Sequence, residues 1–475
     1  MSSPTRASAG RPHGLARWLP GLQAARTYDR AWLPRDIVAA IVLSALLVPQ
    51  GMAYAELAGL PAITGLYTTV VCLVAYAAFG PSPYLVLGPD SSLGPIIAAI
   101  ILPLAAGSTE AAVGLAGMLA LLVGAISIGA GVARLGFIAD LLSQPVRIGY
   151  MAGLAITIVV SQLPDLFGFE IDGGNVLEDL RAFVAALDAT DAATLAVGLL
   201  ALGIIVGLKR LRPRAPGILI AVLITMALSA ALDLAAIGVE VVGVLPQGFP
   251  RPTVPAFELE DLPLLIGGAI GVSLVAVGDP VSVSSGVAAR RGSEVDTEQE
   301  SVAIGSANVA AGFFSGFAVS TSSSRTAVAD QAGAKSQLTG LVAAGLVLAM
   351  LVLVPGLVQW LPLSVLAAII IVAGISLLDG PGIKRLWQVR RSEFAIAAIC
   401  FLGVVLVGVL EGIVIAVIVS IGQIFARAWR PYSAVLGKPE GVPGYHDITR
   451  YPDARQLPGL VIVRWDAPLF FANSM

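Results

Sequence analysis

The chain has 475 residues, of which 57% are hydrophobic and only 12% are charged, and its mean hydropathy is +0.89. Soluble proteins are about a quarter charged, so this composition excludes an ordinary soluble domain and indicates a membrane protein with many spans. The net charge of −3 says nothing useful about partners, and we predict no nucleic-acid partner. The two histidines and two cysteines are too few for a His/Cys metal cluster.

Residues 1–35 are rich in Arg, Ser, Gly and Pro and lack the apolar core and cleavage site of a secretory signal. We expect a cytoplasmic N-terminal arm, with Trp18 and Trp32 near the membrane interface.

Residues 36–430 contain the membrane-spanning segments and are predicted to form the transporter domain. Apolar runs long enough to cross a bilayer lie at 37–58, 63–80, 109–133, 144–163, 190–208, 216–235, 262–288, 338–354, 363–378, 394–410 and 412–428. Shorter or interrupted runs at 91–105, 301–318 and 325–333 predict half-spanning helices. The fold class is therefore all-α and polytopic, with about fourteen transmembrane segments.

Charges in the loops support this count through the positive-inside rule. The loops at 165–191 and 233–261 are acidic and are expected outside, whereas the basic clusters at 209–214 and 384–391 are expected in the cytoplasm. The alternation holds only if the short segments around Ser91 and Arg325 are membrane elements. We expect a bacterial inner (plasma) membrane location with both termini cytoplasmic.

The sequence also contains a weak internal repeat. Pro49 and Pro280 are predicted to interrupt their spans and are 231 residues apart (280 − 49), as are Ser92 and Ser323 (323 − 92). Matched breaks predict a duplicated seven-helix unit, at about 36–235 and 261–430, whose copies are inverted with the substrate site between broken helices. The alternative is that the shared offsets arise by chance.

The polar stretch at 319–335 is the predicted centre of the site. Its run of serines ends with Ser323 and Ser324 and is followed by Arg325. These residues are predicted to begin a short helix between two apolar runs. Free N–H groups, a helix N-terminus and a guanidinium together predict an anion site. The alternatives are an extramembrane loop or an arginine that only packs against carbonyl groups.

Further substrate-binding residues are predicted on two other segments. Ser91 and Ser92 begin the short segment at 91–105 and would face the serines of the 319–335 stretch. A simple helix cap explains Ser91 and Ser92 equally well. Gln50 and Tyr54 are polar positions in the first span and are predicted to contact the substrate, with structural hydrogen bonds as the alternative. Asp90 would repel an anion, and the sequence assigns it no role.

Asp279 lies in the middle of an apolar span with several serines nearby. A carboxylate at this depth predicts a ligand for a coupling Na⁺ or a carrier of a proton. Ser282, Ser322 and Ser323 complete the predicted coupling-ion set. The alternative is that Asp279 is the structural partner of Arg325.

No Walker sequence and no catalytic constellation is present, so we predict no enzyme activity and no cofactor beyond a coupling ion.

Residues 431–475 change in composition. We expect a polar linker at 431–458 and two short strands at 459–475 that begin a truncated soluble domain.

The chain resembles the sulfate permease (SulP) family of anion transporters in four segments. They are PQGMAYAELAGLPAITGLYTT at Pro49–Thr69, LGPDSSLGP from Leu87, STSSSRTAVADQAGAKSQLTGL at Ser320–Leu341, and GLVIVRWDAPLFFANS at Gly459–Ser474. The last segment resembles the start of the family's C-terminal STAS domain, an α/β domain.

The resemblance implies a seven-plus-seven inverted repeat with core and gate domains, usually in a homodimer within membrane lipid. It places the anion between the third and tenth helices, which map onto Ser91–Ser92 and Ser323–Arg325. It matches Asp279 to the acidic residue of sodium-coupled members, but Val283 replaces the hydroxyl found one turn later.

The predicted function is secondary active transport of a small anion by alternating access. Sulfate is the first substrate, followed by bicarbonate and dicarboxylates. The alternatives are a nucleobase transporter of the same fold, an anion channel and a membrane-embedded enzyme.

Overall fold

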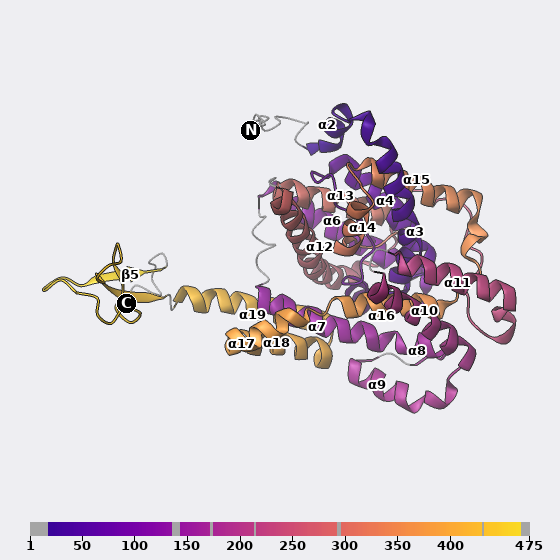
Figure 1. Ribbon diagram of the computed structural model, residues 1–475. Coiled ribbons are helices and arrows are strands. Elements are labelled where there is room, and N and C mark those ends of the chain that lie inside the picture. Colours follow the sequence, from indigo (N-terminus) through magenta and orange to yellow (C-terminus); the bar gives the residue numbers. More distant parts are fainter. Residues whose placement is uncertain are drawn as a thin grey trace. The chain divides into compact units, whose positions relative to one another are not determined.

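The computed structural model describes residues 18–134, 143–171, 174–212, 215–291, 296–429 and 432–466 (Figure 1). The chain divides into two compact units, Met1–Ala416 and Val417–Met475. Seven helices of the described residues are long and apolar enough to cross a membrane, and four shorter apolar helices accompany them. The prediction of an α-helical membrane protein is confirmed.

The first half of the chain is almost entirely helical. In chain order its elements are α2 (Pro20–Arg26), η1 (Arg30–Trp32), α3 (Leu33–Leu57), α4 (Ala62–Phe79), β1 (Leu87–Gly88), α5 (Gly94–Ala105), α6 (Thr109–Val132), α7 (Gln144–Ser161), α8 (Leu163–Phe167), α9 (Val176–Ala185), η3 (Leu187–Ala189), α10 (Ala192–Leu211), α11 (Gly217–Leu232) and η4 (Leu234–Ile237).

The second half is also mainly helical and ends in three short strands. Its elements are η5 (Leu259–Asp261), α12 (Leu262–Arg291), α13 (Thr297–Phe313), β2 (Ser320–Thr321), α14 (Ser323–Gln331), α15 (Leu338–Leu353), η6 (Pro355–Val358), α16 (Leu363–Ser376), α17 (Gly380–Val389), α18 (Arg391–Leu402), the π-helical turn η7 (Gly403–Val407), α19 (Val409–Trp429), β3 (Ser433–Gly437), β4 (His446–Asp447) and β5 (Ile462–Trp465).

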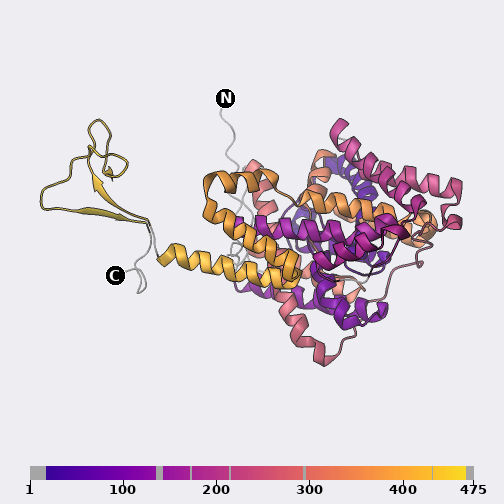
Figure 2. The same cartoon turned by 90° about the horizontal axis from the view of Figure 1, so that it is seen from below.

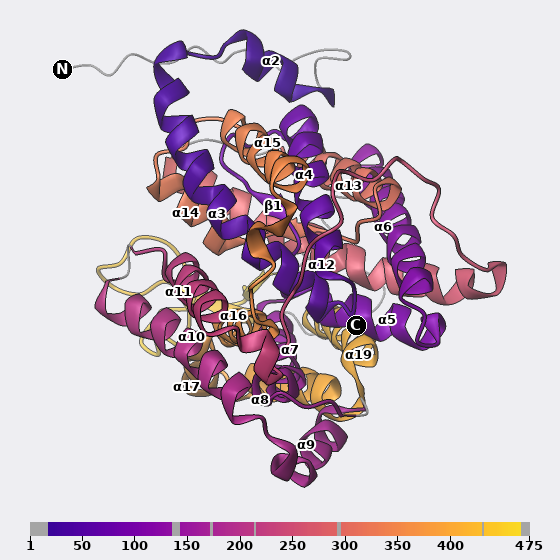
Figure 3. The same cartoon turned by 90° about the vertical axis from the view of Figure 1, so that its right-hand side faces the viewer.

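The membrane helices pack in two groups, which Figures 1 and 3 separate. The first bundle contains α3, α4, α5, α6, α12, α13, α14 and α15, and the second contains α7, α8, α10, α11, α16 and α18. Small residues bring α6 and α13 together, since a Cβ on Gly312 would lie 2.6 Å from the carbonyl oxygen of Gly117. Close backbone approach of this kind is how membrane helices associate without a hydrophobic driving force between them.

The two short strands join segments that are far apart in the sequence. β1 and β2 pair antiparallel, with Leu87 opposite Thr321 and Gly88 opposite Ser320. Thr321 Oγ1 also donates to the carbonyl oxygen of Val86 at 3.0 Å. Because α5 follows β1 and α14 follows β2, the N-termini of the two short helices are brought into one region of the first bundle.

The predicted breaks at Pro49 and Pro280 are wrong. Pro49 lies inside the continuous helix α3, and Pro280 lies inside the continuous helix α12. A proline removes one hydrogen bond from a helix, but neighbouring helices can compensate in a membrane bundle. The helices that interrupt the regular pattern are α5 and α14, each of which is short and preceded by an extended segment.

Two other predicted segments differ in length. The run predicted at 301–318 as a short element is the full helix α13, which begins at Thr297 because the Asp296 carboxylate caps it by accepting from Glu298 N and Gln299 N, both at 3.1 Å. The span predicted at 394–410 is divided, since α18 ends at Leu402 and the π-helical turn follows.

The Val417–Met475 unit contains a three-stranded antiparallel sheet in the order β4-β3-β5. The strands are in yellow in Figure 2. Strand β3 lies inside the predicted linker. The linker prediction is therefore wrong at Ser433–Gly437. Its partner β5 is a predicted strand, whereas the second predicted strand, from Pro468, lies outside the described residues.

Candidate functional site

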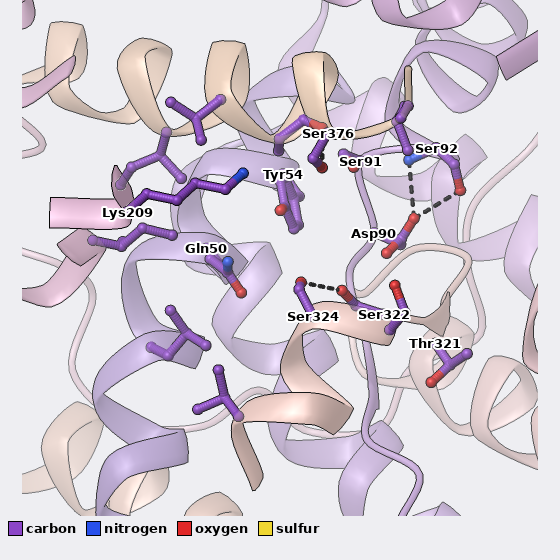
Figure 4. A pocket seen from close by; sticks show the side chains of 18 of the residues that line it. Gln50, Tyr54, Asp90, Ser91, Ser92, Lys209, Thr321, Ser322, Ser324 and Ser376 are labelled. Atoms are coloured by element: carbon purple, nitrogen blue, oxygen red, sulfur yellow. Dashed lines mark hydrogen bonds between the residues drawn. The ribbon is translucent and has the colours of Figure 1, made fainter. Parts of the chain in front are cut away.

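A cavity of about 1400 Å³ lies between the two bundles of the Met1–Ala416 unit. Its wall is built by α3, the start of α5, α12 and the start of α14 from the first bundle, and by α7, α10, α11 and α16 from the second. Figure 4 shows the side chains that line it. The predicted residues Gln50, Tyr54, Ser91, Ser92, Asp279, Ser322, Ser323 and Ser324 all lie on this wall.

The turn before α5 supplies three consecutive polar residues, Asp90, Ser91 and Ser92, which are 9%, 6% and 2% exposed. Asp90 Oδ1 accepts hydrogen bonds from Ser92 N at 3.0 Å and from Ser92 Oγ at 2.7 Å (Figure 4). The carboxylate thus occupies two donors of this turn, which lies on the cavity wall just before the N-terminus of α5.

The start of α14 faces the same cavity. Ser322 is the residue before the helix, and its side chain makes no capping hydrogen bond to the backbone. Its hydroxyl instead lies 2.8 Å from the hydroxyl of Ser324 (Figure 4). The first N–H groups of a helix have no partner within the helix. With no cap from the Ser322 side chain, this N-terminus keeps donor capacity beside the cavity.

Arg325 lies behind this wall and is fully buried. Its Nη2 lies 3.4 Å from the carbonyl oxygen of Gly88 and 3.6 Å from Asp90 Oδ2. Its Nε and Nη1 have no hydrogen-bond partner among the described residues. Each residue of a helix is rotated by about 100° from the previous one, so Arg325 leaves α14 on a different face from Ser324.

The alternative pairing of Arg325 with Asp279 is wrong, because each has another partner. Asp90 lies beside Arg325, whereas Asp279 Oδ1 lies 3.9 Å from Arg147 Nη1. The sequence could not distinguish these pairings, because no residue pattern in α12 or α14 shows which face of the helix packs against which neighbour.

Gln50 and Tyr54 come from α3 and are 5% and 4% exposed. They are four residues apart, so they lie on the same face of the helix. The Gln50 Oε1 atom has no hydrogen-bond partner among the described residues. These two side chains supply an amide and a phenol hydroxyl to the cavity, opposite the serines of α14 in Figure 4.

The ion pair of Arg147 and Asp279 connects the two bundles, since Arg147 belongs to α7 and Asp279 to α12. Both residues line the cavity, as does Val283 one turn after Asp279. The Ser282 side chain lies outside the described part of the structure. Within the described residues, no cluster of His, Cys, Asp and Glu could hold a metal ion.

Comparison with known proteins decides the family. The model of the sulfate permease family matches residues 33–400. The chain belongs to this family. It is 42% identical over 471 residues to the "Probable sulfate transporter MT1781" of Mycobacterium tuberculosis, which covers 99% of this chain and 83% of that protein.

Solved structures share the fold of this sulfate permease family member. The murine Slc26a9 anion transporter in the inward-facing state matches with a TM-score of 0.86 and 25% identity, over 99% of this chain and 81% of that one. The transmembrane domain of the cyanobacterial bicarbonate transporter BicA matches with a TM-score of 0.71 and 22% identity, over 83% of this chain and 99% of that one. The chain is therefore an integral membrane protein of an anion transporter family.

The cavity residues of this sulfate permease family member that the sequence did not identify include Arg147, Lys209, Ser376 and Asp379. A lone arginine in an apolar run is a signal that could have identified Arg147. Lys209 was placed in a cytoplasmic loop because it is the first residue of a basic cluster. It lies in the last turn of α10, and its side chain reaches the cavity (Figure 4).

Proposed function

We propose that this chain transports a small anion across the membrane by secondary active transport, with sulfate as its first substrate. The observation that carries the proposal is the meeting of two short helices at one cavity. The N-termini of α5 and α14 and five hydroxyl side chains, from Tyr54, Ser91, Ser92, Ser322 and Ser324, surround that space. Helix N-termini and hydroxyl groups bind oxyanions without requiring a metal ion.

Sulfate is placed first because the relative at 42% identity is named a probable sulfate transporter. Bicarbonate is the second substrate and a dicarboxylate the third, since serine hydroxyls and helix N-termini accept all three. No nucleic acid is a partner, and the chain is not an enzyme in this proposal.

Alternating access is supported by the position of the cavity between two bundles. A movement of the second bundle against the first would open or close the space, while the β1–β2 pair keeps the short helices together. This division corresponds to the core and gate domains that the resemblance implies.

An inverted repeat of about 36–235 and 261–430 is supported by mirrored packing. If the repeats are related by symmetry, each contact between them has a counterpart in which every helix is replaced by its equivalent in the other repeat. The counterpart of the α6–α12 contact is α15–α3, and the counterpart of the α7–α18 contact is α16–α10. All four contacts are present. The β1–β2 register is itself symmetric, with an offset of 233 residues (320 − 87 and 321 − 88), close to the 231 seen in the sequence. Together with the short helices, this organisation supports fourteen membrane segments.

Coupling through Asp279 is proposed to involve a proton rather than Na⁺. The guanidinium of Arg147, 3.9 Å from the carboxylate, already supplies a positive charge at this place. Val283 adds no oxygen ligand, although Na⁺ would need several. Ser322 and Ser323 share the cavity with Asp279 and would contact the substrate in this scheme.

We further propose that the protein is a homodimer in the bacterial inner membrane, surrounded by lipid and with both termini in the cytoplasm. The strands β3, β4 and β5 would then begin a cytoplasmic STAS domain at 431–475.

Counterflow in proteoliposomes tests the proposal. Vesicles containing the full chain and unlabelled anion are diluted into labelled sulfate, bicarbonate or fumarate, and saturable accumulation of one of them is expected. Flux that does not saturate and shows no trans-stimulation would indicate a channel, and the absence of flux for all three would refute anion transport.

A further inference from the structure

Asp90 occupies donors that a substrate anion would need. Its Oδ1 accepts from the backbone N–H and the hydroxyl of Ser92, and its Oδ2 lies 3.6 Å from Nη2 of Arg325. A backbone N–H, a hydroxyl and a guanidinium are the groups with which proteins hold oxyanions. The carboxylate is therefore an anion that the chain itself places in the site.

The donors around Asp90 are not saturated by it. Arg325 is fully buried, and its Nε and Nη1 have no hydrogen-bond partner among the described residues. A guanidinium offers five N–H donors, so Arg325, directly behind the cavity wall, keeps a positive charge that Asp90 does not saturate. Two negative charges close together repel each other strongly where water is scarce, so the substrate and the Asp90 carboxylate compete for this place.

We propose that Asp90 is a tethered competitor of the substrate and a determinant of specificity by anion charge. This inference rests on the proposed function, because it concerns the same cavity. In the empty site the Asp90 carboxylate holds the two donors of Ser92, in the turn before α5, and pairs with Arg325 of α14; it is displaced when an anion binds. Its charge repels a divalent anion about twice as strongly as a monovalent one. Asp90 thus weakens the binding of sulfate more than that of chloride.

Other charges of the cavity also act on a bound anion. Arg147, Lys209, Asp279 and Asp379 line it, from α7, α10, α12 and the residue before α17. Asp90 differs in that it contacts both the turn before α5, through Ser92, and the arginine of α14. Neutralising Asp90 alone leaves the remaining charges unchanged, so a change in the preference for divalent anions can be attributed to it.

The test is calorimetric titration of the purified full chain with sulfate and, separately, with chloride. Asp90→Asn keeps an oxygen acceptor for Ser92 and removes only the charge. We expect its Kd for sulfate to fall at least tenfold, that for chloride to fall about threefold, and the ratio of the chloride Kd to the sulfate Kd therefore to rise at least threefold. Asp296→Asn is the matched control, because it neutralises a carboxylate that also accepts from backbone N–H groups, those of Glu298 and Gln299, but lies outside the cavity lining. Its ratio should stay within twofold of the original chain.

Asp90→Ser is the second variant, since a serine hydroxyl can also accept from the backbone N–H two residues later and should fold if the asparagine variant does not. An unchanged or lower ratio in either folded variant would overturn the role of Asp90. An equal rise in Asp296→Asn would also overturn it, because the effect would then not depend on a charge in the cavity. If the original chain binds neither sulfate nor chloride, the proposed function itself fails.

Discussion

Gly88 shows how a single residue positions the charge of Arg325. A Cβ built on Gly88 would lie 2.6 Å from Arg325 Nη1, a distance at which one of the two must move. Gly88→Ala should therefore displace the guanidinium from Asp90 and raise the KM for sulfate at least tenfold in proteoliposomes. Gly129→Ala is the control, because nothing lies within 4 Å of a Cβ at this position of α6. Equal KM values in the two variants would contradict the role of Gly88.

A second prediction concerns Asp36, which is fully buried at the start of α3. Its carboxylate accepts from Lys335 N at 2.7 Å, from Ser336 Oγ at 2.8 Å and from Thr339 Oγ1 at 3.1 Å. It thus fixes the turn between α14 and α15. Asp36→Ala leaves several buried donors unpaired and should cost about 3 kcal/mol or more of the free energy of unfolding.

Detergent-induced unfolding of the purified chain measures this change. Asp188→Ala, at an exposed carboxylate in η3, should change the free energy of unfolding by less than about 0.5 kcal/mol. If Asp36→Ala unfolds at the same detergent concentration as this control, the buried carboxylate does not stabilise the turn.

The residue types of the cavity could be predicted from the sequence, but their partners could not. Gln50, Ser92 and Ser324 were identified because polar groups in apolar runs are costly and therefore informative. The pairing of Arg325 with Asp90 depends on the antiparallel register of β1 and β2, which joins segments more than 230 residues apart. Two-residue strands have no periodicity that a sequence could reveal.

The helices, too, could be predicted only in part from the sequence. Long apolar runs predicted most of the spans, since the bilayer requires a minimum length. Pro49 and Pro280 suggested breaks that α3 and α12 do not contain, because the packing of neighbouring helices decides whether a proline is tolerated. In α18, by contrast, the apolar run continues through the π-helical turn at Gly403–Val407, so hydropathy could not mark the end of that helix.

At the level of elements, the ion pair between α7 and α12 predicts a coupling between the two bundles. Arg147→Asp and Asp279→Arg should each reduce sulfate counterflow at least tenfold, because each leaves two like charges facing each other. The double exchange restores the opposite charges and should recover at least a third of the original rate. Uptake should not change when Na⁺ is replaced by choline, since Arg147 supplies the positive charge beside Asp279.

A double variant no better than the single ones would show that the pair does not connect the bundles. Uptake that requires Na⁺ would contradict the proposed use of a proton. Lys384→Asp, on the amphipathic helix α17 and outside the cavity lining, is the control for a general effect of charge reversal.

For the whole molecule, the cavity wall indicates the side from which the site is open. The wall includes Lys209 at the end of α10, Gly217 at the start of α11 and Asp379 before α17. These ends adjoin the basic loops, which the positive-inside rule places in the cytoplasm. The cavity should therefore be reached from the cytoplasm in this conformation, while the acidic loop around Asp188 should lie outside.

Cysteine labelling tests this sidedness. Cys72 and Cys400 are free and buried, so replacing both with alanine gives a background without other thiols. Ser324→Cys in this background should react with a membrane-impermeant maleimide in inside-out vesicles, and sulfate should slow the reaction at least fivefold by occupying the cavity. Asp188→Cys should react only in right-side-out vesicles. Labelling of Ser324→Cys from the outside alone would contradict the predicted orientation. A labelling rate unaffected by sulfate would show that the substrate does not bind at the start of α14.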